Sequence, residues 1–236
     1  MTEERSGRTG AFRLVVFDLD GTLVDSRRDI AEAANRLIVE CGAAPLPEEQ
    51  VVRMVGEGVA VLVERATSAA GIHPVPEGAV DRFIEIYGRG LLVHTRAYPG
   101  ILEVVGDLSR SVPLAVLTNK PRSSSVTILD GLGLRPFFWR ILGGDNPWGR
   151  KPDPEAMRRL VAEAGATPDT AVLVGDSEID LQTSRNAGTR VCLARYGFGH
   201  AGFPFERLDG TELAVDAPAQ LLAVLRCDGA VTSNEQ

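Results

Sequence analysis

Two acidic residues at a spacing of two, Asp18 and Asp20, offer the clearest chemistry in this sequence. They follow an apolar run that ends at Phe17, and Gly21 comes directly after them. Because side chains alternate along a strand, both carboxylates start on the same face, and burying either one unpaired would be costly. We therefore expect a cation between them. The alternative is a solvated Asp-Gly turn at the end of a strand.

A hydroxyl and several backbone N–H groups follow a second apolar run, 112–117. Thr118, Asn119 and Lys120 come next, and Pro121 then stands where a helix would open. Such a strand-to-helix corner suits an oxyanion. In isolation, Thr118 or Asn119 would serve equally well as the N-cap of the next helix.

A further acidic segment and a lysine complete the set. The buried run 171–174 and a glycine precede Asp176, and Asp180 follows four residues later. At that spacing the two acids share one side of the following helical turn. Lys151 lies in a loop restricted by neighbouring prolines, although a lone loop lysine is usually solvated.

Carboxylates from separate strands that converge on one point would repel strongly unless a divalent cation neutralised them. Asp18, Asp20 and Asp176 each follow a predicted strand, with Thr118 and Lys151 nearby in the predicted layout. Hard oxygen ligands with room for water and phosphate select Mg²⁺. Magnesium, a lysine and a hydroxyl together predict a pocket for a phosphoryl group.

The elements that position these residues alternate between short apolar runs and helical patterns. Uninterrupted Val, Leu and Ile stretches suit strands covered on both faces, and the helices between them supply the cover. We therefore predict an α/β fold with a doubly wound parallel sheet, whose ligands collect at the carboxyl ends of the strands. The predicted strands are 12–17, 112–117, 140–142, 171–174, 190–194 and 213–215.

The segment 26–99 breaks this alternation, because it holds helical patterns and no convincing strand. Apolar residues recur with helical spacing over 30–41, 59–70 and 80–91. About seventy residues are more than one crossover needs. We therefore predict a helical insert over 27–95 that lies over the strand ends as a lid. Ordinary crossover helices packed on the sheet are the alternative.

Composition limits the partners of the chain. The formal net charge of −7 argues against nucleic acid or an anionic membrane as the main partner. No apolar run approaches the ~20 residues of a membrane span. We therefore expect a cytoplasmic protein. We also expect its cysteines to be reduced, because Cys41, Cys192 and Cys227 are far apart. The polar tails, 1–10 and 228–236, are predicted to be disordered.

The ordered motifs resemble those of the haloacid dehalogenase superfamily. The insert is similar to the C1 cap of that superfamily, which implies a Rossmann-like catalytic core over 11–26 and 96–227 and a cap over 27–95. Within the superfamily, the chain resembles the phosphoglycolate phosphatases. The motifs that carry the resemblance are Asp18-Leu19-Asp20-Gly21-Thr22, Thr118, Lys151-Pro152 and Gly175-Asp176-Ser177-Glu178-Ile179-Asp180.

The resemblance also implies roles for individual residues. Asp18 resembles the nucleophile that attacks phosphorus and forms an aspartyl-phosphate. Asp20 resembles the general acid that protonates the leaving alkoxide and the base that then activates water. The implied binding groups are Asp18, the Asp20 backbone carbonyl and Asp176 for Mg²⁺; Thr118, the Asn119 backbone and Lys151 for phosphoryl oxygens; and Asp180 in support of the metal or of Lys151.

These roles imply a Mg²⁺-dependent phosphomonoesterase for a small phosphorylated carboxylic acid, with 2-phosphoglycolate first, acting as a monomer or homodimer. The loop 56–58 is expected to face the substrate, and Arg53 or Arg65 are candidates for binding its carboxylate. The alternatives are a sugar phosphomutase related to β-phosphoglucomutase and a non-catalytic phosphate-binding regulatory module.

Overall fold

A six-stranded parallel sheet forms the centre of the molecule in a computed structural model, which describes residues 12–200, 203 and 205–226. Cys227 and the tails predicted to be disordered, 1–10 and 228–236, lie outside the described residues. The doubly wound parallel sheet predicted from the sequence is confirmed. In spatial order its strands are β5 (Phe138–Leu142), β4 (Leu114–Leu117), β1 (Leu14–Phe17), β6 (Ala171–Gly175), β7 (Arg190–Ala194) and β8 (Leu213–Val215).

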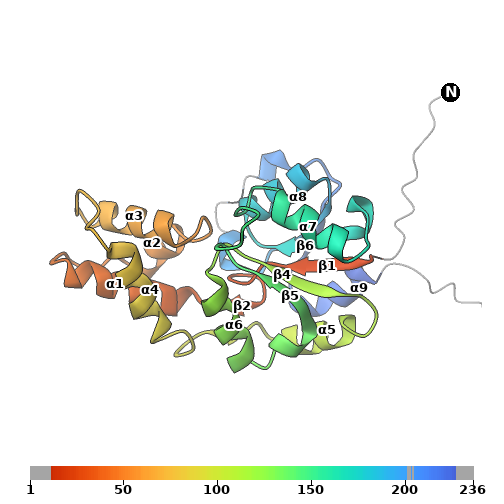
Figure 1. Ribbon diagram of the computed structural model, residues 1–236, viewed down its shortest axis with the longest axis horizontal. Coiled ribbons are helices and arrows are strands. Elements are labelled where there is room, and N and C mark those ends of the chain that lie inside the picture. The colour runs from red at the N-terminus through yellow and green to blue at the C-terminus, as the bar shows by residue number, and fades with distance from the viewer. Residues whose placement is uncertain (1–11, 201–202, 204, 227–236) are drawn as a thin grey trace, which may run out of the picture.

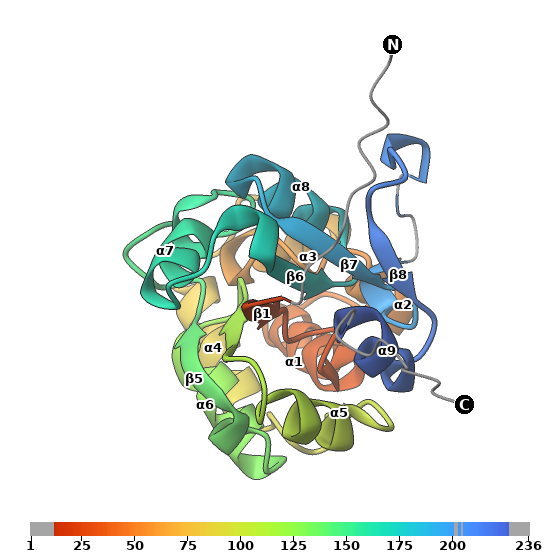
Figure 2. The ribbon, with the colours of Figure 1, turned by 90° about the vertical axis from the view of Figure 1, so that its right-hand side faces the viewer.

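Helices cover both faces of this sheet (Figure 2). Side chains of β1 alternate, so that Leu14 and Val16 pack with one group of apolar residues and Val15 and Phe17 with another. The first group includes α7 (Glu155–Glu163), with α8 (Glu178–Ala187) beside it. On the other face lie α5 (Ile101–Leu108), α6 (Arg122–Gly131) and α9 (Leu221–Leu225).

The strand order places a crevice between β1 and β6. From β1 the chain passes to β4 on one side, whereas from β6 it passes to β7 on the other. Ligands of open parallel sheets bind where the connections diverge in this way, at the carboxyl ends of the strands. The register puts Phe17 beside Val174, and Asp18 N donates to Val174 O over 2.9 Å. The acids that follow β1 and β6 therefore meet at one edge.

Four helices lie together beyond that edge, apart from the helices that flank the sheet (Figure 1). The longest, α1, packs against the other three around a shared apolar core. They are α1 (Arg27–Glu40), α2 (Glu48–Val52), α3 (Val59–Ala69) and α4 (Ala79–Gly88). We refer to residues 27–95 as the helical insert.

Two short strands join the helical insert to the sheet. β2 (Val24–Asp25) and β3 (Arg96–Ala97) pair in antiparallel fashion, Val24 opposite Ala97. The expectation of no strand between residues 26 and 99 is therefore wrong at β3. Two residues are too few to show a period of two, so this ribbon could not be predicted from the apolar pattern.

Three of the predicted strands start at other residues: β1 begins at Leu14 rather than at residue 12, and the other two differ for local reasons. β4 begins at Leu114 rather than at residue 112, because Pro113 has no N–H group for a strand ladder. β5 begins two residues earlier than predicted, at Phe138. It is an edge strand in which Trp139 and Arg140 interrupt the apolar run. Its register with β4 shifts there, since Phe138 lies opposite Leu114 and Arg140 opposite Ala115.

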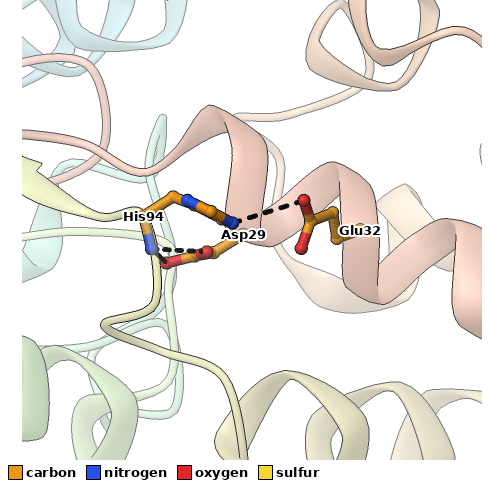
Figure 3. A group of neighbouring side chains, drawn as sticks. All are labelled: Asp29, Glu32 and His94. Atoms are coloured by element: carbon orange, nitrogen blue, oxygen red, sulfur yellow. Dashed lines mark hydrogen bonds and ion pairs between the residues drawn. The ribbon is translucent and has the colours of Figure 1, made fainter.

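A buried aspartate fastens the end of the helical insert to α1 (Figure 3). Asp29 accepts hydrogen bonds from His94 N, Thr95 N and Thr95 Oγ1 at 2.7–3.0 Å. Glu32 lies one turn further along α1, with its Oε1 3.4 Å from His94 Nε2. Asp29, Glu32 and His94 have the spacing of metal ligands. The hydrogen bonds from residues 94 and 95, however, already satisfy the buried Asp29 carboxylate.

No helix in the described part of the chain is long and apolar enough to cross a membrane.

Candidate active site

Three aspartates meet in the crevice between β1 and β6. One carboxylate oxygen from each of Asp18, Asp176 and Asp180 lies within 4.8 Å of the others. Asp18 is the first residue after β1, Asp176 the first after β6, and Asp180 lies in the first turn of α8. All three are buried, with exposed fractions of 7%, 1% and 0%. The sequence-predicted acids from the two strands are thus brought together.

Asp180 has both carboxylate oxygens occupied by protein donors. Ser177 donates to Oδ2 through its backbone N at 3.1 Å and through its Oγ at 2.6 Å, which makes a capping box at the start of α8. Lys151 Nζ donates to Oδ1 over 2.7 Å. Asp180 therefore orients Lys151 and helps to cap the N-terminal end of α8.

Lys151 links two of the three acids. Its Nζ lies 2.7 Å from Asp18 Oδ1 and 2.7 Å from Asp180 Oδ1. Both carboxylates raise the pKa of Lys151, against the effect of its burial. The ammonium group therefore stays charged beside Asp18, where an incoming anion would need it.

The surroundings of Asp18 and Asp176 disfavour the ionised forms of their carboxyl groups. Burial raises the pKa of Asp18 to about 6, because Lys151 only partly offsets the loss of water and the repulsion from Asp180. Burial also raises the pKa of Asp176 well above its usual range, and Asp18 and Asp180 add to this. A single hydrogen bond from Gly199 N, 2.7 Å from Asp176 Oδ2, works in the opposite direction.

A divalent cation fits this arrangement. Asp18 and Asp176 retain carboxylate lone pairs beyond their protein contacts. A cation between them would offset the burial and the repulsion from neighbouring carboxylates that raise both pKa values. Gly21 leaves the space for Asp176, since a Cβ there would lie 1.9 Å from Asp176 Oδ2. Its φ of 87° is also a conformation that favours glycine.

The Asp20 carboxylate is not part of this cluster and has partners of its own. Lys120 Nζ lies 2.9 Å from both Asp20 carboxylate oxygens, and Ser26 Oγ donates to Oδ1 over 2.5 Å. Tyr87 of α4 covers the lysine, with 4.5 Å between Nζ and the ring centroid. Asp20 and Lys120 thus form a second charged centre between the sheet and the helical insert.

Sequence reasoning noticed Lys120 only as part of a motif and gave it no role. Lysine is usually exposed, and its partner Asp20 lies 100 residues earlier in the chain. The signal that could have found it is its position three residues after β4, at the same sheet edge as Asp20.

Thr118 and Asn119 occupy the corner between β4 and α6. The Thr118 Oγ1 accepts from Lys120 N at 3.3 Å. The Asn119 side chain donates to Lys151 O and to Gly56 O, each over 2.9 Å, whereas its buried Oδ1 has no hydrogen-bond partner. Sequence reasoning gave Asn119 a backbone role at phosphate, or an N-cap as the alternative, whereas its side chain joins the Lys151 loop to the helical insert.

A cavity of about 70 Å³ lies between the strand ends and the helical insert. Gly56 and Gly58 line it, as expected for the loop 56–58. Arg53 and Arg65 are not among its lining residues, and Arg65 forms an ion pair with Glu57 instead. The predicted site residues that line it are Asp18, Asp20, Thr118, Asn119, Lys151 and Asp176; helical-insert residues that line it include Ile30, Leu62, Phe83 and Tyr87.

Comparisons with known proteins agree with this geometry. A family model for haloacid dehalogenase-like hydrolases matches residues 15–194. A phosphoglycolate phosphatase of Rhodospirillum rubrum is 39% identical over 194 residues, which covers 79% of this chain and 80% of the relative. Another from Cereibacter sphaeroides is 40% identical over 193 residues, covering 79% and 87%.

A solved structure shows the same architecture. The crystal structure of a predicted phosphoglycolate phosphatase from Haemophilus somnus superposes with a TM-score of 0.83 at 30% identity, covering 90% of this chain and 97% of that one. Together with the family match over 15–194, this likeness extends across the sheet and the helical insert. The chain therefore belongs to the haloacid dehalogenase-like hydrolase family, and it is a phosphatase of that family.

Proposed function

We propose that this phosphatase is a Mg²⁺-dependent phosphomonoesterase that acts through a phosphorylated Asp18 on a small phosphorylated carboxylic acid, with 2-phosphoglycolate as the first candidate. One observation carries the proposal: the Asp18 and Asp176 carboxylates lie within 4.8 Å of one another, with Lys151 at 2.7 Å from Asp18. The relatives that are named phosphoglycolate phosphatases support the choice of substrate.

The proposed metal site uses Asp18, Asp176 and the backbone carbonyl of Asp20. When bound there, Mg²⁺ would supply positive charge that keeps Asp18 ionised and neutralises phosphoryl oxygens. Asp180 would not contact the metal itself and would hold Lys151 in position through their hydrogen bond.

The proposed reaction has two displacements on phosphorus. An Asp18 carboxylate oxygen forms a bond to phosphorus as the bond to the ester oxygen breaks, and Asp20 gives its proton to that oxygen. Water then attacks the phosphorus atom of the phosphorylated Asp18, and Asp20 takes the water's proton. The bond between phosphorus and the Asp18 oxygen breaks, which releases phosphate and restores the Asp18 carboxylate. Lys151, Thr118 and the Asn119 N–H would bind the phosphoryl oxygens in both steps.

The helical insert would act as a cap over this reaction. We propose that 27–95 is the cap, and that 11–26 and 96–227 form the core. Phe83 and Tyr87 present apolar surface to the cavity from the helical-insert side, which would keep water away from the reacting groups until the first product has left. The β2–β3 ribbon would hold the two connections together.

The charge of the cavity favours hydrolysis of a small ester over a sugar phosphomutase reaction. A mutase must hold a second phosphate as well as the one being transferred. Among the described residues that line the cavity, the cationic side chains are Lys120 and Lys151. Lys151 lies beside Asp18, where the transferred phosphoryl group would bind, so Lys120 alone would face a second, doubly charged phosphate.

The test is phosphate release from 2-phosphoglycolate by the purified protein with Mg²⁺. Asp18→Asn should abolish turnover, whereas Asp130→Asn, the same change at an exposed residue of α6, should leave it intact. Chelation with EDTA should suppress turnover, and added Mg²⁺ should restore it. Full activity of Asp18→Asn or of the chelated enzyme would refute the proposed reaction.

A further inference from the structure

Both lysines of this chain lie in the candidate active site. Lysine and arginine together number 25, but only two of these residues are lysines, Lys120 and Lys151. Both are buried, with exposed fractions of 7% and 5%, and both line the cavity. An ammonium group is compact and can contact several oxygens in a closed space, whereas a guanidinium needs room for its planar fork. Two separate centres of positive charge therefore face whatever binds there.

The two lysines lie on different sides of the reaction. Lys151 contacts Asp18 and Asp180, on the side where phosphorus would be bound. Lys120 contacts Asp20, the group proposed to protonate the ester oxygen. The leaving group must lie against Asp20 to receive that proton, so Lys120 is the lysine that borders the leaving group.

Lys120 presents its charge where the leaving group would lie. Its ammonium group contacts the Asp20 carboxylate, lies against the Tyr87 ring and lines the cavity. Among the described lining residues, the other cationic side chain is Lys151, which lies beside Asp18. A negatively charged group on the leaving alcohol would therefore meet its complementary charge at Lys120.

We infer that Lys120 binds the carboxylate of the substrate, and that it makes the enzyme select phosphate esters of small hydroxy acids over esters of neutral alcohols. This inference rests on the proposed function and names the residue that sets its substrate class. In 2-phosphoglycolate the carboxylate carbon is two bonds from the ester oxygen, within reach of a group beside Asp20. Arg53 and Arg65 do not line the cavity.

The kinetic test compares two esters of equal length, 2-phosphoglycolate and 2-hydroxyethyl phosphate, in which CH₂OH replaces the carboxylate. Lys120→Gln keeps a donor for Asp20 and removes the charge. It should lower kcat/KM for 2-phosphoglycolate by roughly 10- to 100-fold more than for the neutral ester, mainly through KM. Lys120→Arg should recover part of this selectivity. Equal losses on both esters would overturn the inference and leave Lys120 as a positioning residue for Asp20.

A binding measurement separates this inference from the proposed function. In 3-phosphonopropionate a methylene replaces the ester oxygen of 2-phosphoglycolate, so binding needs no turnover, and 3-hydroxypropylphosphonate is its neutral match. Calorimetry with Mg²⁺ should show that the wild type prefers the carboxylate compound and that Lys120→Gln does not. If the wild type hydrolyses no ester, the proposed function fails while this comparison still decides the role of Lys120. Equal binding of both phosphonates by the wild type would overturn it.

A third readout needs no variant that could misfold. The chain has two lysines. Protein labelled with ¹³C-lysine therefore gives two sets of lysine side-chain signals in an NMR spectrum. Adding 3-phosphonopropionate should shift both sets, whereas inorganic phosphate should shift mainly that of Lys151. A Lys120 signal that responds identically to both compounds would contradict the inference.

Discussion

At the scale of single residues, the site depends on carboxylates that the fold holds closer together than their charges favour. Burial raises the pKa of Asp18 and Asp176, and repulsion from Asp180 adds to the effect at both. A carboxyl group whose pKa is raised by folding lowers stability once the pH exceeds its unfolded value, here 3.8, and the full loss is reached above the folded pKa. The site is therefore expected to weaken the metal-free protein.

Asp176→Asn should stabilise the protein in EDTA, because the amide removes the repelled charge and can still accept from Gly199 N. The gain in Tm should be larger at about pH 8 than at about pH 5, since the penalty grows as the carboxyl ionises. Each kcal/mol gained corresponds to roughly 2–4 °C in a protein of this size. Thermal unfolding at both pH values measures this difference.

Magnesium provides the matching control for this prediction. Added Mg²⁺ should raise the Tm of the wild type through binding to the folded state, and it should have little effect on Asp176→Asn. A lower Tm for the variant in EDTA at both pH values would show that the carboxylate is not under electrostatic strain.

The sequence allowed most of these residues to be predicted, because each follows an apolar strand of a parallel sheet. Asp18 and Asp176 could be placed together for that reason. The pairing of Asp20 with Lys120 could not, since it depends on side-chain directions of two loops that are 100 residues apart. Nor could periodicity show that the Asn119 side chain reaches Gly56, because irregular loops carry no period.

At the scale of elements, close contacts between loops set the geometry of the strand ends. Gly21 shows this directly, since a Cβ there would lie 1.9 Å from Asp176 Oδ2. Its neighbourhood could not be read from the sequence, although an Asp-Gly turn was expected. The fold was predicted more completely than the contacts, because apolar runs define strands and helical spacing defines the insert, whereas the two-residue ribbon of β2 and β3 has no such pattern.

Gly21→Ala should impair both folding and metal binding, because it combines an unfavourable φ with a collision at Asp176. Gly42→Ala is its matched control: φ is 85° there and 87° at Gly21, but nothing lies within 4 Å of a Cβ at Gly42. The control should lose about 1 kcal/mol of unfolding free energy. Chemical denaturation and a Mg²⁺ titration should show a larger loss of stability and weaker binding only for Gly21→Ala. Equal behaviour of the two variants would exclude the collision.

Asn119→Ala should loosen the connection between the Lys151 loop and the helical insert, because it removes two hydrogen bonds of the side chain. We expect kcat/KM to fall roughly 30-fold, given about 1 kcal/mol for each of the two bonds. Asn186→Ala removes a similar bond, from Asn186 Nδ2 to Pro152 O, at an exposed position. Steady-state kinetics of both variants decide the matter: comparable losses would mean that the Asn119 bridge has no special part in catalysis.

At the scale of the whole molecule, an acidic chain handles an anionic substrate by concentrating its lysines in one cavity. The net charge is −7, and both lysines line the space between sheet and helical insert. The sequence predicted that an insert follows the first acidic motif, but not which of its side chains would cover the site. Tyr87 lies on Lys120 only because α4 packs against α1 and faces the strand ends.

We propose that Asp18 itself receives the phosphoryl group, and acid quenching within the first turnovers would trap the phosphorylated enzyme. The protein would be mixed with Mg²⁺ and 2-phosphoglycolate, quenched, digested and examined by peptide mass spectrometry. We predict one phosphoryl group on the peptide that contains Asp18, located at that residue by fragmentation and absent from Asp18→Asn. Release of phosphate without any phosphorylated Asp18 peptide at the shortest times, or phosphorylation of a different residue, would contradict the account.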